Sequence, residues 1–120
     1  MSGEEVLREV LDVWRAGIDA HEPDRVAQVF TTDAIFQGLQ PYSVGRAGVR
    51  GYYASQPLGL TVRYRILETR TPADGVVLGY TRADFTFADG TGVSLNLSVL
   101  VTRTPDGWQI AHYQVSPLPN

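Results

Sequence analysis

The first twenty positions carry hydrophobic residues at helical spacing. The largest of them recur every three or four residues. Such spacing places them on one face of an amphipathic helix. The pattern therefore predicts a helix over residues 4–20 with one buried face. The residues of that face are Leu7, Leu11, Trp14 and Ile18.

Shorter elements are predicted before residue 56. Pro23 suits the first position of a second helix, because proline lacks only an N–H that is unpaired there in any case. The predicted segments are that helix from Pro23 to near Phe30, a strand over 31–37, a Gly-, Pro- and Ser-rich loop over 38–45, and a third helix over 46–54.

The rest of the chain alternates between apolar and polar residues, as strands do. Turn signals at 72–75, 88–92 and 104–107 divide it into long antiparallel strands. Over 93–101 every second residue is Val or Leu, so we expect that face to point inward and Ser94, Asn96 and Ser98 to point outward.

Arg82 and Asp84 lie two residues apart in the strand-like run 76–87. Period-two geometry puts them on the same face as Val76, Leu78 and Tyr80. We expect this face to point inward, where two charges are costly unless they pair or meet a ligand. The pair is therefore either a functional site or, equally, a salt bridge on a solvated face.

The composition narrows the functional classes. The chain has 120 residues, enough for one domain over 1–120, and a formal net charge of −3, which argues against a nucleic-acid surface. It has no cysteine, and His21 and His112 lie far apart without a carboxylate cluster, so we expect no metal and no cofactor. The N-terminus lacks a signal-peptide pattern and no apolar run could span a membrane, so we expect a cytoplasmic location.

Three motifs resemble the nuclear transport factor 2-like (SnoaL-like) superfamily. They are the segments 23–34, 45–53 and 107–113. The resemblance implies an α+β cone, in which a curved antiparallel sheet wraps around a long N-terminal helix and two short helices. It also implies an enclosed cavity for a ligand and a homodimer through the convex face of the sheet.

Arg82 and Asp84, with the segment 94–100, resemble limonene-epoxide-hydrolase-like proteins. In that family, the Asp protonates an epoxide and the Arg bridges it to a second Asp. Here Gln114 stands at the second Asp, and Phe36 and Gly38 stand at the water-positioning Tyr and Asn. The match is therefore partial, because an amide cannot act as the general base.

Two further likenesses concern the ligand. Relative to ketosteroid isomerase, Trp14, Gly38 and an apolar stretch around Val99 stand where that family has its catalytic residues, so that chemistry is set aside. The segments 36–39 and 108–117 resemble the SgcJ/EcaC-type small proteins found beside bacterial secondary-metabolite genes, including enediyne polyketide clusters. This resemblance implies a hydrophobic, polyketide-like ligand.

These observations predict a site. If the site is catalytic, Asp84 transfers a proton, Arg82 orients Asp84, and His112 relays a proton. The alternatives are a structural ion pair for Arg82 and Asp84 and a core histidine held by one hydrogen bond. The residues expected to bind the ligand are Trp14, Ile18, Phe36, Gln37, Tyr53, Tyr80, Leu97, Val99 and Gln114.

Three functions stay open on these grounds. The favoured one is acid–base assistance of a cyclisation, isomerisation or epoxide-type opening of the ligand, and the alternative is a carrier without catalysis. The third is an adaptor that works through the convex face. We expect that face to carry Ser94, Asn96 and Ser98 and to form a homodimer. The residues expected beside them are Thr81, Phe85, Phe87 and Tyr113.

Overall fold

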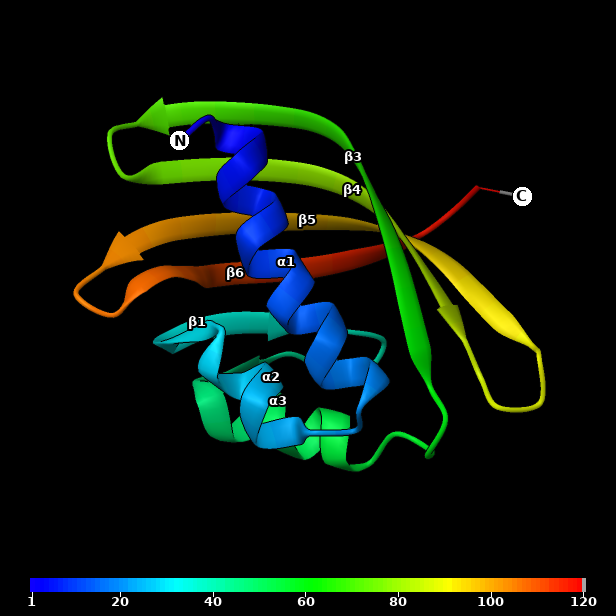
Figure 1. The fold of residues 1–120 in the computed structure, drawn as a ribbon. Coiled ribbons are helices and arrows are strands. Elements are labelled where there is room, and N and C mark those ends of the chain that lie inside the picture. Colours follow the sequence, from blue (N-terminus) through cyan, green and yellow to red (C-terminus); the bar gives the residue numbers. More distant parts are fainter. Residues whose placement is uncertain (120) are drawn as a thin grey trace.

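A computed structural model of the chain describes residues 1–119 (Figure 1). Three helices precede most of a six-stranded sheet. The helices are α1 (Gly3–Asp19), α2 (Pro23–Gln28) and α3 (Arg46–Ala54). The strands are β1 (Phe30–Gln37), β2 (Ser43–Val44), β3 (Thr61–Ala73), β4 (Val76–Thr86), β5 (Gly92–Thr104) and β6 (Gly107–Pro117). The predicted α+β fold is confirmed.

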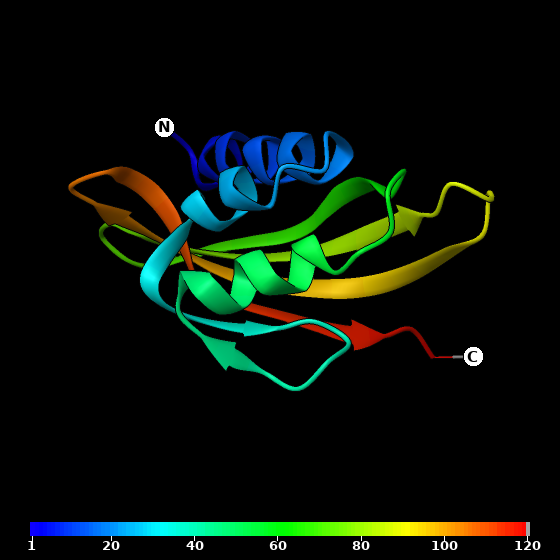
Figure 2. The same ribbon diagram turned by 90° about the horizontal axis from the view of Figure 1, so that it is seen from below.

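The sheet is strongly curved, and its strands run in the order β2-β1-β6-β5-β4-β3. All neighbouring strands pair antiparallel except β1 and β6, which are parallel. All three helices lie on the same side of the sheet, as Figure 2 shows. We call this side the inner face and the opposite side the outer face.

Helix α1 forms as the hydrophobic spacing predicts. Its N-terminus is closed by a capping box, in which the Ser2 side chain accepts from the Glu5 N–H and the Glu5 carboxylate accepts from the Ser2 N–H. Its apolar face is buried against the sheet. The buried residues of α1 are Val6, Leu7, Val10, Leu11, Trp14, Gly17 and Ile18.

Strand β5 also behaves as predicted. Leu95, Leu97, Val99 and Val101 are buried on the inner face, and the Ser and Asn residues between them are not. This strand lies in the middle of the sheet, so its aliphatic row forms the floor of the core.

Strand β4 presents the opposite face from the one predicted. Val77, Gly79, Thr81 and Ala83 are buried, whereas Leu78, Tyr80 and Asp84 are exposed. The inner row consists mostly of small residues because α1 packs closely against it. A Cβ atom on Gly79 would lie 2.7 Å from a methyl group of Leu7. The expected inward face, with Leu78 and Tyr80, has no room under the helix.

Strand β6 differs from the prediction for another reason. Its pairing with β5 shifts between Leu100 and Val101, so Ala111 is an extra residue in the ladder. Beyond this bulge the alternation is reversed. Ile110 and Tyr113 are therefore both buried, while His112 and Gln114 lie on the outer face.

Candidate functional site

A small aromatic pocket lies between α3, the segment that follows it, and parts of β4, β5 and β6. Its volume is about 40 Å³, which accommodates only a few water molecules. This space is smaller than the ligand-sized cavity that the resemblance implies, and a larger ligand must displace a lining side chain. The lining residues are Leu39, Tyr52, Tyr53, Gln56, Leu60, Phe85, Phe87, Val93, Leu95, Tyr113 and Val115.

A chain of hydrogen bonds connects the core to this pocket. The indole N–H of Trp14 donates to the Tyr53 hydroxyl at 3.1 Å, and the Tyr53 and Tyr113 hydroxyl oxygens lie 3.2 Å apart. The indole and the two hydroxyls supply three hydrogens, but the chain has only two links. One hydroxyl hydrogen of the pair is therefore left to donate to something else, whichever way the link between the tyrosines points.

Stacked rings hold this hydroxyl pair in place. The ring of Tyr113 stacks on Phe36, with centroids 4.6 Å apart and an angle of 23° between the planes. Phe36 also meets Tyr53 edge-on at 5.7 Å. Aromatic pairs of this kind add to the stability gained from burial alone. The two phenols are thus fixed before any ligand arrives.

The chemistry of the pocket is that of neutral donors. Burial raises the pKa of both Tyr53 and Tyr113, because a phenolate would lose its hydration. Both phenols therefore keep their protons at neutral pH. None of the described residues that line the pocket is a carboxylate, an imidazole or a guanidinium. The pocket can donate a hydrogen bond, but its lining offers no strong base.

The sequence-based site residues are dispersed through the structure. Of the ligand-binding set, Tyr53 lines the pocket. Trp14, Ile18, Phe36, Leu97 and Val99 are core residues. Gln37 donates to the carbonyl oxygens of Gly38 and Gln40. Tyr80 and Gln114 lie on the outer face, far from their expected place in the cavity wall.

The prediction that Arg82 and Asp84 point into the interior is wrong. Asp84 is exposed on the outer face and accepts a 2.6 Å hydrogen bond from the Ser94 hydroxyl. No salt bridge joins it to Arg82 among the described residues. Their assignment as catalytic groups stays a prediction, and any chemistry that they perform takes place outside the pocket.

His112 also lies on the outer face, contrary to the expected inward position. Its Nε2 is 3.3 Å from the Gln114 side-chain oxygen, and its cross-strand neighbours are Leu100 and Ile35. It is not near Asp84 along the ladder, and although the next residue, Tyr113, lines the pocket, His112 projects from the opposite face of the sheet. The proposed trio of Asp84, Arg82 and His112 is not brought together around a cavity.

Sequence reasoning missed Tyr113, Phe85 and Phe87 as pocket residues and assigned them to the outer face. The positions of Phe85 and Phe87 are explained by the reversed face of β4. They continue the alternate-residue row of Thr81 and Ala83, which points inward. For Tyr113 the signal was weaker, because the bulge at Ala111 breaks the alternation within its own strand.

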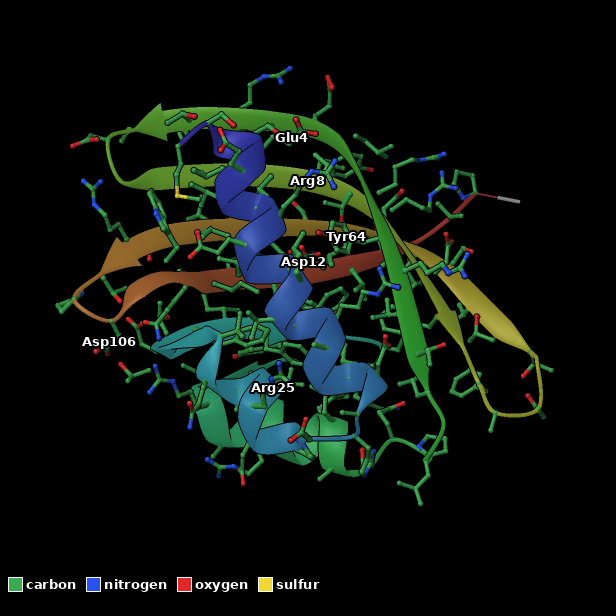
Figure 3. All side chains as sticks on the ribbon, in the orientation of Figure 1. Glu4, Arg8, Asp12, Arg25, Tyr64 and Asp106 are labelled. Carbon is green, nitrogen blue, oxygen red and sulfur yellow. The ribbon has the colours of Figure 1, made fainter. Side chains whose placement is uncertain are left out.

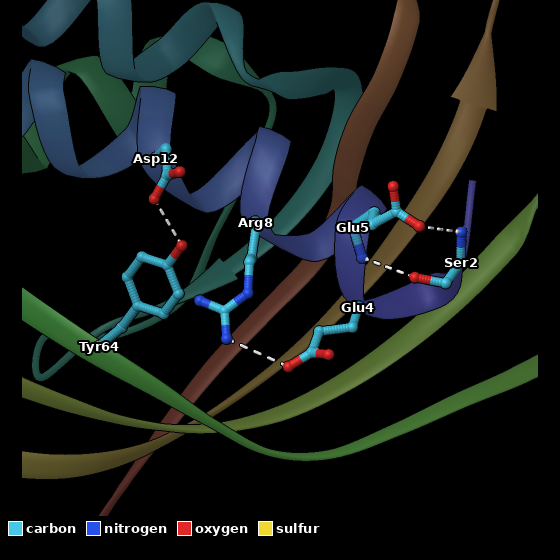
Figure 4. Close-up of polar contacts among 6 residues, drawn as sticks. All are labelled: Ser2, Glu4, Glu5, Arg8, Asp12 and Tyr64. Atoms are coloured by element: carbon cyan, nitrogen blue, oxygen red, sulfur yellow. Dashed lines mark hydrogen bonds and ion pairs between the residues drawn. The ribbon is translucent and has the colours of Figure 1, made fainter.

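A second polar cluster fastens α1 to the edge strand β3 (Figures 3 and 4). The Tyr64 hydroxyl donates to the Asp12 carboxylate at 2.5 Å, and Arg8 pairs with Glu4 at 3.1 Å on the same helix. Near the C-terminus of α1, the Asp19 carboxylate accepts a hydrogen bond from the backbone N–H of Val62 on β3. The Asp19 contact satisfies a backbone N–H of β3, an edge strand that lacks a neighbour on one side, and the Tyr64–Asp12 hydrogen bond ties the same strand to α1.

Alkaline pH should destabilise the fold. Burial, followed by the hydrogen bond to Asp12 and its charge, raises the pKa of Tyr64 to about 12. The pKa values of Tyr53 and Tyr113 are raised too. A raised folded pKa means that stability is complete below the unfolded value near 10 and is lost as pH rises toward the folded value.

This pH dependence is measurable by urea unfolding between pH 8 and 11. The chain has neither Lys nor Cys, so tyrosines dominate the side-chain titration in this range. We expect the free energy of unfolding to fall above pH 10 and to fall less steeply in Tyr64→Phe. A constant free energy across this range would contradict the expectation.

Two surveys of the described residues, 1–119, are negative. No helix there is long and apolar enough to cross a membrane. No group of three or more His, Cys, Asp or Glu side chains is arranged to hold a metal ion.

Comparisons with known proteins agree on the fold. A family model for a SnoaL-like domain matches residues 7–120. No curated protein matches the chain significantly. Three similar solved structures illustrate the fold, and their low identities mean that they support the fold alone.

A protein with a cystatin-like fold from Nostoc punctiforme has 14% identity and a TM-score of 0.85, covering 98% of this chain and 78% of its own. A ketosteroid isomerase-like protein from Erwinia carotovora has 19% identity and a TM-score of 0.80, and the match covers 97% of this chain and 96% of that protein. An NTF-2 like protein from Shewanella oneidensis has 13% identity and a TM-score of 0.81, and the match covers 96% of this chain and 99% of that protein.

Proposed function

The chain belongs to the SnoaL-like domain family, whose model matches residues 7–120, and from this premise we propose that it binds a small, uncharged, hydrophobic molecule in the aromatic pocket. The observation that carries the proposal is the spare hydroxyl hydrogen of the Tyr53–Tyr113 pair, fixed beside an apolar lining. A buried donor without an acceptor is costly, so a ligand that supplies an acceptor oxygen is favoured.

The lining determines which part of a ligand enters. Aromatic rings on α3, β4 and β6 favour the flat edge of a ring system, and the hydroxyl pair favours a carbonyl or ether oxygen on that edge. At about 40 Å³ the pocket holds only part of such a molecule until a lining side chain moves. Leu39 is exposed at its rim and can turn away without loss of core packing. A polyketide-type aromatic ketone has this chemistry.

Binding without catalysis is the function that the pocket supports better than acid–base catalysis. Proton abstraction needs a base within hydrogen-bond reach of the substrate. The described lining residues contain no carboxylate or imidazole, and the raised pKa values of the two tyrosines make them poor bases at neutral pH. The enzymatic alternative relies on Asp84, which lies on the other face of the sheet.

A pair of ligands that differ only in the acceptor tests the proposal. 1-Indanone carries a ring ketone, and indane is the same skeleton without the oxygen. A hydrogen bond contributes about 0.5–1.5 kcal/mol, so wild-type protein should bind indanone about two- to tenfold more tightly than indane in calorimetric titrations.

Tyr53→Phe/Tyr113→Phe should abolish this preference while binding of indane is retained, whereas Tyr113→Phe alone leaves the Tyr53 hydroxyl hydrogen free to donate. Tyr64→Phe is the matched control, since it removes a phenol hydroxyl that does not line the pocket. Asp84→Asn should bind indanone as wild type does and keep the whole function, whereas the enzymatic alternative expects this variant to lose turnover while it keeps the ligand. An indanone preference that survives in Tyr53→Phe/Tyr113→Phe would overturn the proposal.

A further inference from the structure

Four arginines gather on the outer face of the sheet where β3 pairs with β4. They are Arg63, Arg65 and Arg70 on β3 and Arg82 on β4. Cross-strand partners project from the same face, so the register shows which side chains are neighbours. Arg63 lies directly opposite Asp84, and Arg65 lies directly opposite Arg82.

Two of the four arginines are matched by carboxylates. Asp84 faces Arg63 across the ladder, a favourable position for opposite charges, and it also accepts the hydrogen bond from Ser94. Glu68 pairs with Arg70 at 3.4 Å on the same strand. Each of these carboxylates therefore already has an arginine of its own.

The other two arginines, Arg65 and Arg82, are unmatched. They face each other across the ladder, where like charges repel. Neither forms an ion pair within residues 1–119. The Nε atom of Arg82 is buried and has no hydrogen-bond partner among these residues. Part of this cation is thus removed from water without compensation, which is costly unless an anion is close.

The row of this pair continues with neutral polar groups. Asn96 on β5 lies opposite Arg82, and Ser116 on β6 lies opposite Asn96. The amide and the hydroxyl can both donate hydrogen bonds. At about 4.8 Å per strand, the four residues extend over about 14 Å. We call Arg65, Arg82, Asn96 and Ser116 the cationic row.

From this juxtaposition we propose that the cationic row binds one phosphate group, either the free ion or that of a small ester, through the guanidinium groups of Arg65 and Arg82. The planar guanidinium matches the spacing of phosphate oxygens, and the Asn96 amide adds a donor beside it. A phosphate group carries close to two negative charges at neutral pH, so it balances both arginines, whereas a carboxylate balances only one.

The surroundings limit the ligand to a single phosphate group. Asp84 lies on the row at one side of the cationic row, and Glu68 lies on the row at the other side. The successive phosphates of a nucleic acid would meet these carboxylates, and the formal net charge of −3 is unfavourable for any extended acidic surface. The aromatic pocket lies on the inner face, so the phosphate site is independent of the function proposed for the pocket.

Titration of the full chain with inorganic phosphate, followed by NMR of the arginine side chains, tests the proposal. At about pH 8, where the ion is mostly a dianion, the signals of Arg65 and Arg82 should shift with a dissociation constant of about 1 mM or lower. Acetate should bind about tenfold more weakly. Phenyl phosphate distinguishes the two sources: tighter binding than inorganic phosphate assigns the site to an ester, and equal binding assigns it to the free ion.

Single substitutions locate the site. Arg65→Gln and Arg82→Gln should each weaken phosphate binding about tenfold, because each removes a hydrogen bond to a charged acceptor. Arg103→Gln is the matched control. It changes the net charge equally, but Arg103 lies seven residues along β5 from Asn96, or about 23 Å.

Circular dichroism establishes that each variant is folded, so a loss of binding is not mistaken for unfolding. Three results would overturn the proposal. They are unshifted arginine signals up to about 20 mM phosphate, acetate binding as tightly as phosphate, and a dissociation constant that neither Arg65→Gln nor Arg82→Gln changes.

Discussion

Replacing Trp14 with alanine should lower the free energy of unfolding by about 3–5 kcal/mol, the usual cost of truncating a large buried aromatic residue. Trp14 is completely buried and contacts the rings of Phe85 and Tyr113 at centroid distances of 6.1 and 6.0 Å. Its removal creates a cavity beneath α1 where the helix meets the sheet. The total free energy of unfolding of a small domain is only about 5–15 kcal/mol, so this loss is a large fraction of its stability.

The same substitution should also disturb the pocket. Without the indole N–H, the Tyr53 hydroxyl loses its donor and is free to turn. We therefore expect a weaker preference for indanone over indane in any folded Trp14→Ala protein. Trp14→Phe should recover much of the stability but not the hydrogen bond.

Trp108→Ala is the matched control for this experiment. Trp108 is only partly buried, and its main polar contact is the Arg103 guanidinium, which lies 5.6 Å from the ring centroid. An exposed cation–π contact contributes about 0.5–1 kcal/mol, so urea unfolding should show a much smaller change. Equal losses at both tryptophans would contradict the assignment of Trp14 to the centre of the core.

Local patterns in the sequence were enough to predict the elements. Helix α3 occupies the predicted residues 46–54, and the turn signals fall between the observed strands. The apolar face of α1 and the buried row of β5 were also predicted, because each has only one face that can be buried. The faces of β4 were ambiguous, since Val76, Leu78 and Tyr80 are as hydrophobic as the row between them.

The face that β4 turns inward is determined by a contact between segments far apart in the sequence. The helix lies so close to the strand that only small residues fit beneath it, and no local pattern contains that distance. The bulge at Ala111 likewise arises from pairing with β5, and it moved His112 to the outer face. The predicted inward placement of the three catalytic residues was wrong for these two reasons, because it assumed uninterrupted alternation and placed the bulkier row inward.

Gly79→Val should therefore be among the most disruptive substitutions on the sheet. The Cβ atom would lie 2.7 Å from one methyl carbon of Leu7 and 2.8 Å from the other, and both residues are buried. We expect a loss of about 2–3 kcal/mol, the upper part of the range for overpacked cores. If β4 presented the face expected from its sequence, Gly79 would point to solvent, and valine would be tolerated or even favoured by its strand propensity.

Two further variants make the test specific. Gly51→Ala adds a methyl group where nothing lies within 4 Å, on the exposed side of α3, and should stabilise the helix by about 0.5–1 kcal/mol. Leu7→Ala combined with Gly79→Val should cost less than the sum of the two single changes, because the smaller residue vacates the space that valine needs. Additive losses in that double variant would show that the two side chains do not compete for one space. If Gly79→Val is as stable as wild type, Gly79 points to solvent, and the prediction that Arg82 and Asp84 lie on the inner face would be correct.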